Sequence, residues 1–343
     1  MKSFKFIWTI IFFLPFLGFG CSQQKSVETS IPELVSESRK NPVYTDFVIN
    51  THDWVLPEQS AATLNRIIDL HEKYQIPVDI FLDDQITQVY HEQYPELLAR
   101  LKTSPVVAVS YHLRPPTPYY WDWDWLGLTE MDDATLYNTI KNYEEHRMDL
   151  VTGLPTDEPG GYQFLKDLMD YPPFIVSGIE TTRNIHQTAC KIWLEKGAFF
   201  SLKHEGGTAW GEKSDGLWLR PEDVEVKVYE LADQPTSEEI LIDALAQVPT
   251  DRAAFVNLKW HENNFYSKET SWRFTYGKKQ GGTNKPPFDV DRAINDAVLK
   301  SSAEQNEMWQ RYEELLIYVK NQPEIFTAIN ARNLAEVSTL LEN

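Results

Sequence analysis

Short apolar runs alternate along most of the chain with stretches whose apolar residues repeat at helical spacing. The stretch Ala61–Tyr74, for example, places apolar side chains at positions 64, 67, 68 and 70, which lie on one face of a helix. This alternation predicts repeated strand–helix units, and no glycine-rich turn of the dinucleotide-binding type follows the first strand. We therefore expect an α/β fold built as a parallel (β/α) barrel.

The expected elements follow from the same pattern. The expected strands are Thr45–Thr51, Pro77–Leu82, Val106–Tyr111, Phe174–Ser177, Phe199–Lys203, Val224–Tyr229 and Ala254–Leu258. The expected helices are Ala61–Tyr74, Tyr94–Lys102, Asp132–Asp149, Gly161–Met169, Thr182–Lys196, Ser237–Gln247 and Glu304–Lys320.

The amino terminus has the pattern of an export signal. A basic start, Met-Lys-Ser-Phe-Lys, precedes an apolar run over residues 6–20 that is shorter than the roughly 20 residues of a spanning helix. Cys21 follows this run, which resembles a bacterial lipoprotein signal, although Gly18 stands where that signal usually has Leu. We expect a signal peptide over residues 1–20, a tether over 21–42 attached to the membrane through lipid on Cys21, and one folded domain over 43–343. The expected location is the bacterial cell envelope.

Charge and composition restrict the partners. The 343-residue chain carries a formal net charge of −19, which argues against binding to nucleic acid or anionic lipid through a broad basic surface. The acidic excess is interpreted as solvated surface. Aromatic residues make up 13% of the chain, and such side chains suit both the core and stacking on sugar rings. Two cysteines cannot form a disulfide framework, and the sequence leaves the oligomeric state open.

Histidines and carboxylates follow several of the expected strands. His52 and Asp53 come after the first strand and Asp83 and Asp84 after the second, and His112, His204 and His261 follow later ones. Active sites of parallel barrels lie at the carboxyl ends of the strands. Imidazoles and carboxylates that converge there from separate strands are the donors of a catalytic divalent-metal site.

Several of these segments resemble the polysaccharide deacetylases, carbohydrate esterase family 4. The segment 46–82, with His52-Asp53 and then Tyr74-Gln75-Ile76-Pro77-Val78-Asp79-Ile80-Phe81, is similar to the start of that domain. Val109-Ser110-Tyr111-His112 resembles the motif that supplies a metal-binding histidine, and Val256–His261 resembles the late strand whose histidine is the general acid. The likeness covers most of residues 43–343 and extends to the final helix, strand and helix over 309–335. It implies a distorted barrel and hydrolysis of acyl groups on carbohydrate.

The resemblance also implies roles for individual residues. Asp53 and His112 are expected to bind a divalent cation, with Zn²⁺ as the expected ion, and His261 is expected to be the general acid. His52 replaces the family's usual carboxylate base and is either a base or a ligand. The family's second histidine after His112 is missing, so His52, His204 or His261 would have to complete the metal site.

Substrate contacts are expected from a loop after His112. Arg114 suits an oxyanion or a sugar carboxylate, or a structural ion pair. Trp121, Trp123 and Trp125 alternate with aspartates and form either a sugar-stacking wall or a lid packed on the barrel. His204 is a further candidate for substrate contact.

Two other functions stay open at this stage. A glycoside-cleaving enzyme would need two carboxylates across the bond, from among Asp83, Asp84, Glu180 and Glu205. A glycan-binding lipoprotein would keep the aromatic loop without catalysis. Of the remaining candidates, His186 and Cys190 are interpreted as a helix core pair, and His71, His91 and His146 as solvent-facing helix residues.

Overall fold

Parallel strands follow one another around the sheet of the computed structural model in the order of the sequence. The structure describes residues 41–121, 123–177, 182–202, 207–228, 235–268, 283–289, 291 and 298–341. The predicted signal peptide, Cys21 and most of the tether lie outside these residues, as do His204, Glu180 and Glu205.

The main sheet has the strand order β10-β11-β1-β2-β3-β6-β7-β9-β8, and every neighbouring pair is parallel except β9 and β8 (Lys213–Ser214), which form an antiparallel hairpin. Starting at β1, the parallel strands β1, β2, β3, β6, β7 and β9 follow one another in sequence order, and β10 and β11 then lead back to β1. Among the described residues, this ring is open between β9 and β10. The predicted α/β barrel is therefore confirmed, in an open, distorted form. The strands are β1 (Val43–Thr51), β2 (Val78–Leu82), β3 (Val107–His112), β6 (Ile175–Ser177), β7 (Phe200–Ser201), β9 (Leu217–Leu219), β10 (Val224–Lys227) and β11 (Ala254–His261).

Strand β12 (Phe326–Ile329) explains part of the distortion. One edge of β1 pairs with β11 over nearly its whole length, so β2 and β12 must share the other edge. There β12 pairs with Val43–Asp46 and β2 pairs with Val48–Thr51. The carboxyl-terminal strand therefore separates the amino-terminal part of β1 from β2, while their carboxyl ends stay paired.

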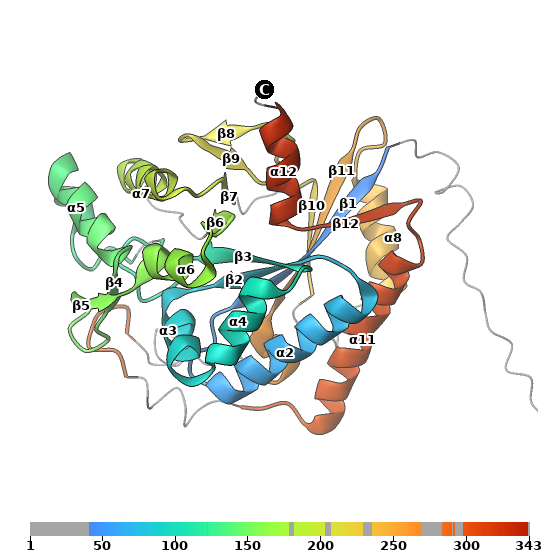
Figure 1. Cartoon of the computed structure of the whole chain (residues 1–343), viewed down its shortest axis with the longest axis horizontal. Coiled ribbons are helices and arrows are strands. Elements are labelled where there is room, and N and C mark those ends of the chain that lie inside the picture. The colour runs from blue at the N-terminus through green and yellow to red at the C-terminus, as the bar shows by residue number, and fades with distance from the viewer. Residues whose placement is uncertain are drawn as a thin grey trace, which may run out of the picture.

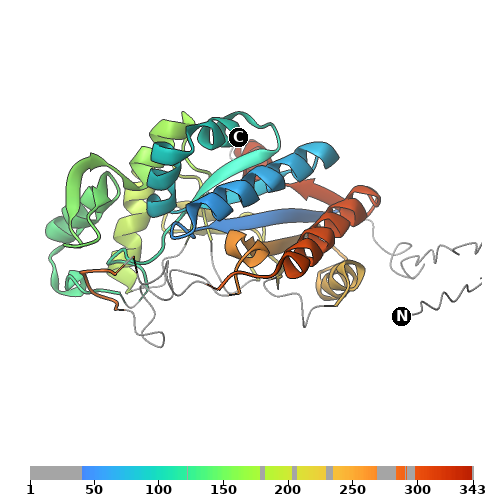
Figure 2. The ribbon, with the colours of Figure 1, turned by 90° about the horizontal axis from the view of Figure 1, so that it is seen from below.

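Helices cover the outside of the sheet (Figure 1). Helix α2 packs against α3 and α11, and α11 also packs against α8. Figure 2 shows β1 flanked by α2 and α11. The helices are α2 (Pro57–Tyr74), α3 (Asp84–Gln93), α4 (Pro95–Thr103), α5 (Asp133–Tyr143), α6 (Gly161–Met169), α7 (Arg183–Lys196), α8 (Ser237–Gln247), α11 (Ser302–Lys320) and α12 (Ala331–Leu341), with short 3₁₀ turns η1 (Leu128–Glu130) and η2 (Glu262–Phe265). No described helix is long and apolar enough to cross a membrane.

Most predicted elements agree with the structure, and one helix is shorter than predicted. The predicted helix Asp132–Asp149 ends at Tyr143, and the chain continues as β4 (His146–Met148), which pairs with β5 (Pro155–Pro159) in a separate antiparallel hairpin. The buried carboxylate of Glu144 accepts hydrogen bonds from the Tyr119 hydroxyl (2.8 Å) and the Tyr162 amide (3.0 Å). These contacts hold the helix end against neighbouring segments, which the helical period alone does not reveal.

His71 is also placed differently from the prediction. It was expected to face solvent, but it is fully buried. Its Nδ1 lies 2.9 Å from the Ile76 carbonyl oxygen and its Nε2 lies 2.6 Å from the Tyr312 hydroxyl. Burial lowers the pKa of His71 to about 4. The tertiary packing of α11 on α2 thus turns a polar position of a surface helix into part of the core.

Candidate functional site

Three imidazoles meet at the carboxyl ends of the barrel strands. Side chains of a strand alternate between its two faces, and Ala108 and Phe255 belong to the apolar cluster on the inner face of the sheet. His112, at the end of β3, is four residues after Ala108, and His261, at the end of β11, is six residues after Phe255. Because these separations are even, both histidines lie on the same inner face. The ring centroid of His52, just after β1, lies 4.7 Å from that of His261 and 6.3 Å from that of His112.

We call His52, Asp53, His112, His261 and Glu262 the strand-end cluster. His52, Asp53 and His112 are almost fully buried, and His261 is partly exposed. The cluster is therefore open toward solvent on the His261 side and closed by packed protein on the others, as far as the described residues show. Such partial exclusion of water strengthens electrostatic interactions between its members.

Glu262 was not predicted as a site residue. It is the first residue of η2 and is fully buried, and its Oε1 accepts hydrogen bonds from the backbone amides of His52 (2.8 Å) and Asp53. Burial and the nearby charge of Asp53 raise the pKa of Glu262 to about 8. The carboxyl group thus fixes the turn after β1 from the neighbouring strand end. Its position directly after His261 was the only sequence signal for this role.

Two other buried carboxyls belong to this region: Asp53 within the cluster, and Asp83, which is affected by the charge of Asp53. Asp53 is fully buried, and its Oδ2 accepts a hydrogen bond from the Tyr266 hydroxyl at 2.8 Å. Asp83 caps the amino terminus of α3 by accepting a hydrogen bond from the Ile86 amide at 2.8 Å. Burial, together with the charges of Asp84 and Asp53, raises the pKa of Asp83 to about 8 against the opposing effects of the Ile86 hydrogen bond and the charge of Arg114. At neutral pH, Asp83 therefore holds a proton for a large fraction of the time.

Ser177 orients the imidazole of His112. The Ser177 hydroxyl at the end of β6 lies 2.9 Å from His112 Nδ1, and both side chains are buried. A hydrogen bond at one ring nitrogen sets the ring plane and the tautomer, which is how outer residues position ligating or catalytic imidazoles. Ser177 carries no sequence signal, because serine is common at strand ends.

A divalent cation fits this cluster in donor type. Imidazole nitrogens and a carboxylate are the ligands of catalytic zinc sites. However, the ligand atoms are not gathered around one point, because among the described residues only His186, Cys190 and Asp215 place three potential ligand atoms within 4.8 Å of one another. Binding of an ion by Asp53, His112 and a third side chain of the cluster would therefore require side-chain rotation.

Arg114 lies beside the cluster. Arg114 Nη1 donates to the Tyr120 hydroxyl at 3.2 Å, and its charge acts on both Asp83 and Lys259.

The aromatic loop is divided between core and surface. Trp123 and Trp125 pack against the hydrophobic core, and Trp125 Nε1 donates to a loop carbonyl at 3.3 Å. These rings are therefore part of a lid packed on the barrel.

Trp121 differs from the other two tryptophans of the loop. Its side chain is 45% exposed, and its φ of 49° lies in the left-handed region that few residues other than glycine adopt. Asp124 accepts hydrogen bonds from the backbone amides of Leu128 (2.5 Å) and Thr129 (3.0 Å), the first two residues of η1. Trp121 is therefore the ring of the three best placed for stacking on a sugar, and Asp124 has a structural role.

A polar cavity has a volume of about 400 Å³. Its lining includes Trp54 and Asp84, which follow Asp53 and Asp83 directly in the sequence. Its lining combines an indole ring with amides and charged groups, a mixture suited to sugar hydroxyls. The lining includes Trp54, Asp84, Gln85, Gln88, Arg147 and Glu158.

No protein-family model and no curated protein matches this chain. Among solved structures, it is similar to a protein from Mycobacterium smegmatis named as a polysaccharide deacetylase, with 10% identity over 89% of this chain and 95% of that chain, at a TM-score of 0.41. It is also similar to a 4-alpha-glucanotransferase from Thermococcus litoralis, with 11% identity over 83% of this chain and 48% of that one (TM-score 0.42), and to a CE4 family pseudoenzyme from Bacillus anthracis, with 10% identity over 64% and 55% (TM-score 0.35). These likenesses are too distant to assign a family or an activity, and the family resemblance stays a prediction.

Proposed function

We propose that this chain is a hydrolase that removes an acyl group, such as acetyl, from a carbohydrate at the carboxyl end of its barrel. The observation that carries the proposal is the meeting of three imidazoles from separate strand ends, 4.7 and 6.3 Å apart, beside the buried carboxylate of Asp53. Imidazoles titrate near neutral pH, and hydrolysis of an acyl group needs both a proton acceptor and a proton donor.

The geometry supports a division of roles. Asp53 and His112 would hold a divalent cation, with Zn²⁺ as the expected ion, and the ion when bound supplies Lewis acidity toward the acyl carbonyl. His52 lies near both of the other imidazoles and accepts the proton of the attacking water at a ring nitrogen. His261, the partly exposed member, donates a proton to the departing sugar hydroxyl or amine.

Two residues position or stabilise these groups. Glu262 acts through the backbone amides of His52 and Asp53, so it is a positioning residue. The guanidinium of Arg114 brings a permanent positive charge that suits the negative charge developing on the carbonyl oxygen.

The test combines metal analysis of the purified protein with acetate release from a panel of N- and O-acetylated glycans. We expect bound divalent metal and acetate release in the parent and in His146→Ala, which removes an imidazole outside the strand-end cluster whose Nδ1 lies 3.1 Å from the Asn142 carbonyl oxygen. His52→Ala and His261→Ala should lose acetate release. A parent without metal or hydrolysis that still binds glycans, and loses that binding in Trp121→Ala, would instead identify a glycan-binding protein.

Glycoside cleavage is the second candidate, and the buried carboxyls favour it. Asp83 and Glu262 both have a pKa of about 8, and the charge of Asp53 contributes to both shifts. A carboxyl with a raised pKa near a second carboxyl group is the arrangement that glycosidases use. Release of reducing ends without acetate, abolished in Asp83→Asn, would establish this alternative.

We also propose that the protein is exported and anchored by lipid on Cys21. The basic start, the apolar run and the cysteine that follows it support this proposal. The full chain should fractionate with membranes and become soluble in Cys21→Ser, and equal solubility of the two forms would contradict the anchor.

A further inference from the structure

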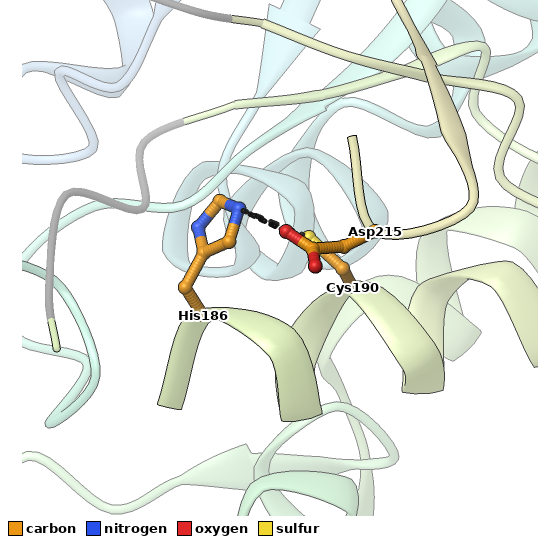
Figure 3. Close-up of side chains that lie close together, drawn as sticks. All are labelled: His186, Cys190 and Asp215. Carbon is orange, nitrogen blue, oxygen red and sulfur yellow. Dashed lines mark hydrogen bonds and ion pairs between the residues drawn. The ribbon is translucent and has the colours of Figure 1, made fainter. Parts of the chain in front are cut away.

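A second cluster of potential metal ligands lies between helix α7 and the turn of the β8–β9 hairpin. We call His186, Cys190 and Asp215 the α7 cluster. His186 and Cys190 are four residues apart and therefore lie on the same face of the helix, one turn apart. Figure 3 shows both side chains rising from α7 and Asp215 reaching toward them from the hairpin.

The hairpin turn sets the position of Asp215. Strand β8 (Lys213–Ser214) and β9 are joined by Asp215 and Gly216, whose φ angles are 50° and 88°. Positive φ at both central residues is the type I′ turn, which favours Asp-Gly. A Cβ on Gly216 would lie 2.9 Å from the Leu194 side chain, so glycine allows the turn to approach α7 closely.

The distances between the ligand atoms agree with a tetrahedral ion. His186 Nε2 lies 3.4 Å from Asp215 Oδ2 and 3.5 Å from Cys190 Sγ. Bonds of about 2.0–2.1 Å to nitrogen and oxygen and about 2.3 Å to sulfur, at tetrahedral angles, separate such atoms by roughly 3.4–3.6 Å. The third pair, sulfur to carboxylate oxygen, lies within 4.8 Å, so a small rotation of the Asp215 side chain closes the set.

The surroundings suit an ion that enters from solvent. The side chains of His186 and Asp215 are 29% and 24% exposed, while Cys190 is buried in the core behind them. Gln187 Nε2 donates to Asp215 Oδ1 at 3.2 Å, which orients the carboxylate so that Oδ2 faces His186. Without an ion, burial and the charge of Asp215 raise the pKa of Cys190 to about 12. A bound cation reverses this local field, and a coordinating thiol loses its proton.

We propose that His186, Cys190 and Asp215 bind a divalent transition-metal ion of the zinc class, with the fourth position open to water. A thiolate, an imidazole and a carboxylate together select such a cation over Mg²⁺ or Ca²⁺, which prefer oxygen ligands. The ion would join α7 to the β8–β9 hairpin. This site is separate from the strand-end cluster and does not depend on the proposed function.

Cobalt(II) is the probe, because a cysteine thiolate bound to it gives a charge-transfer absorption that imidazole and carboxylate ligands do not. The full chain is used as Cys21→Ser, so that Cys190 is the only thiol. We expect the band to saturate at one ion per chain, to vanish in Cys190→Ser, and to require at least about tenfold more cobalt in His186→Ala and Asp215→Asn. Asparagine keeps the turn preference while removing the charge.

Asp243→Asn, on the exposed face of α8, is the matched control for loss of a carboxylate and should leave the titration unchanged. Asp53→Asn should also keep the band, which separates this site from the strand-end cluster. The unfolding midpoint of each variant without metal reports whether it folds. Absence of a thiolate band in the folded parent, or a band unaffected by both His186→Ala and Asp215→Asn, would overturn the proposal.

Discussion

The strand-end cluster and the α7 cluster both combine imidazole with a carboxylate, but their side chains are held differently. In the strand-end cluster, buried groups are already engaged: Glu262 with two backbone amides, Asp53 with Tyr266, and His112 with Ser177. In the α7 cluster, the potential ligand atoms of His186, Cys190 and Asp215 face one another directly, and two of the three are partly exposed.

The difference separates two uses of the same side chains. A buried imidazole held by a hydrogen bond, as His112 is by Ser177, keeps a set geometry, which acid–base chemistry requires. Ligand atoms that face one another at tetrahedral spacing are suited to capturing an ion. The strand-end cluster is therefore the stronger candidate for proton transfer, and the α7 cluster the stronger candidate for a preformed metal site.

The largest effect is expected from His261. If His261 is the general acid, His261→Ala should lower kcat by roughly 10²–10⁴ while metal content stays unchanged. Asp53→Asn should instead lower metal content and activity together, because it removes a ligand charge. Steady-state kinetics with metal analysis of the same samples distinguishes the two, and full activity in Asp53→Asn would show that the site is misplaced.

His71 should make the fold more sensitive to acid. Its pKa is about 4 in the folded protein and 6.5 when unperturbed, so between these values the unfolded chain binds more protons. The contribution of His71 to stability should therefore fall by about 3 kcal/mol as pH decreases from about 6.5 to about 4, whereas buried carboxyls with a raised pKa, such as Asp83 and Glu262, change stability in the opposite direction. Urea unfolding across this range should show that the stability of the parent relative to His71→Gln decreases as pH falls, whereas the difference between the parent and His91→Gln, at an exposed position, should stay constant. Identical slopes in all three proteins would assign the acid sensitivity elsewhere.

Metal stoichiometry tests the comparison directly. If both clusters bind an ion, equilibrium dialysis against zinc should give two ions per parent chain, one in Asp53→Asn or Cys190→Ser, and none in the double variant. Loss of both ions on either single substitution would show that the two clusters are not independent.

The smallest effect is expected in the aromatic loop. Trp121 is exposed, so Trp121→Ala should raise KM several-fold with little change in kcat or stability. Trp125 packs against the core, so Trp125→Ala should lower the free energy of unfolding by about 2–3 kcal/mol. Substrate kinetics and denaturant unfolding of both variants measure the contrast, and a stability loss in Trp121→Ala would place that ring with the packed pair.

The amino-acid sequence by itself determined the order of strands and helices, and with it the barrel. The polar residues after β1, β3 and β11 could also be predicted, because the period of a strand and the carboxyl-end rule depend only on local pattern. Tertiary structure decided the rest. Glu262 holds the end of β1 across a separation of about 210 residues, His71 is buried by a helix from the other end of the chain, and Asp215 reaches His186 from a hairpin that periodicity did not predict. Contacts of this kind depend on which distant segments of the chain pack together. A local hydrophobic pattern does not contain that information, because it reports only the period of one helix or strand.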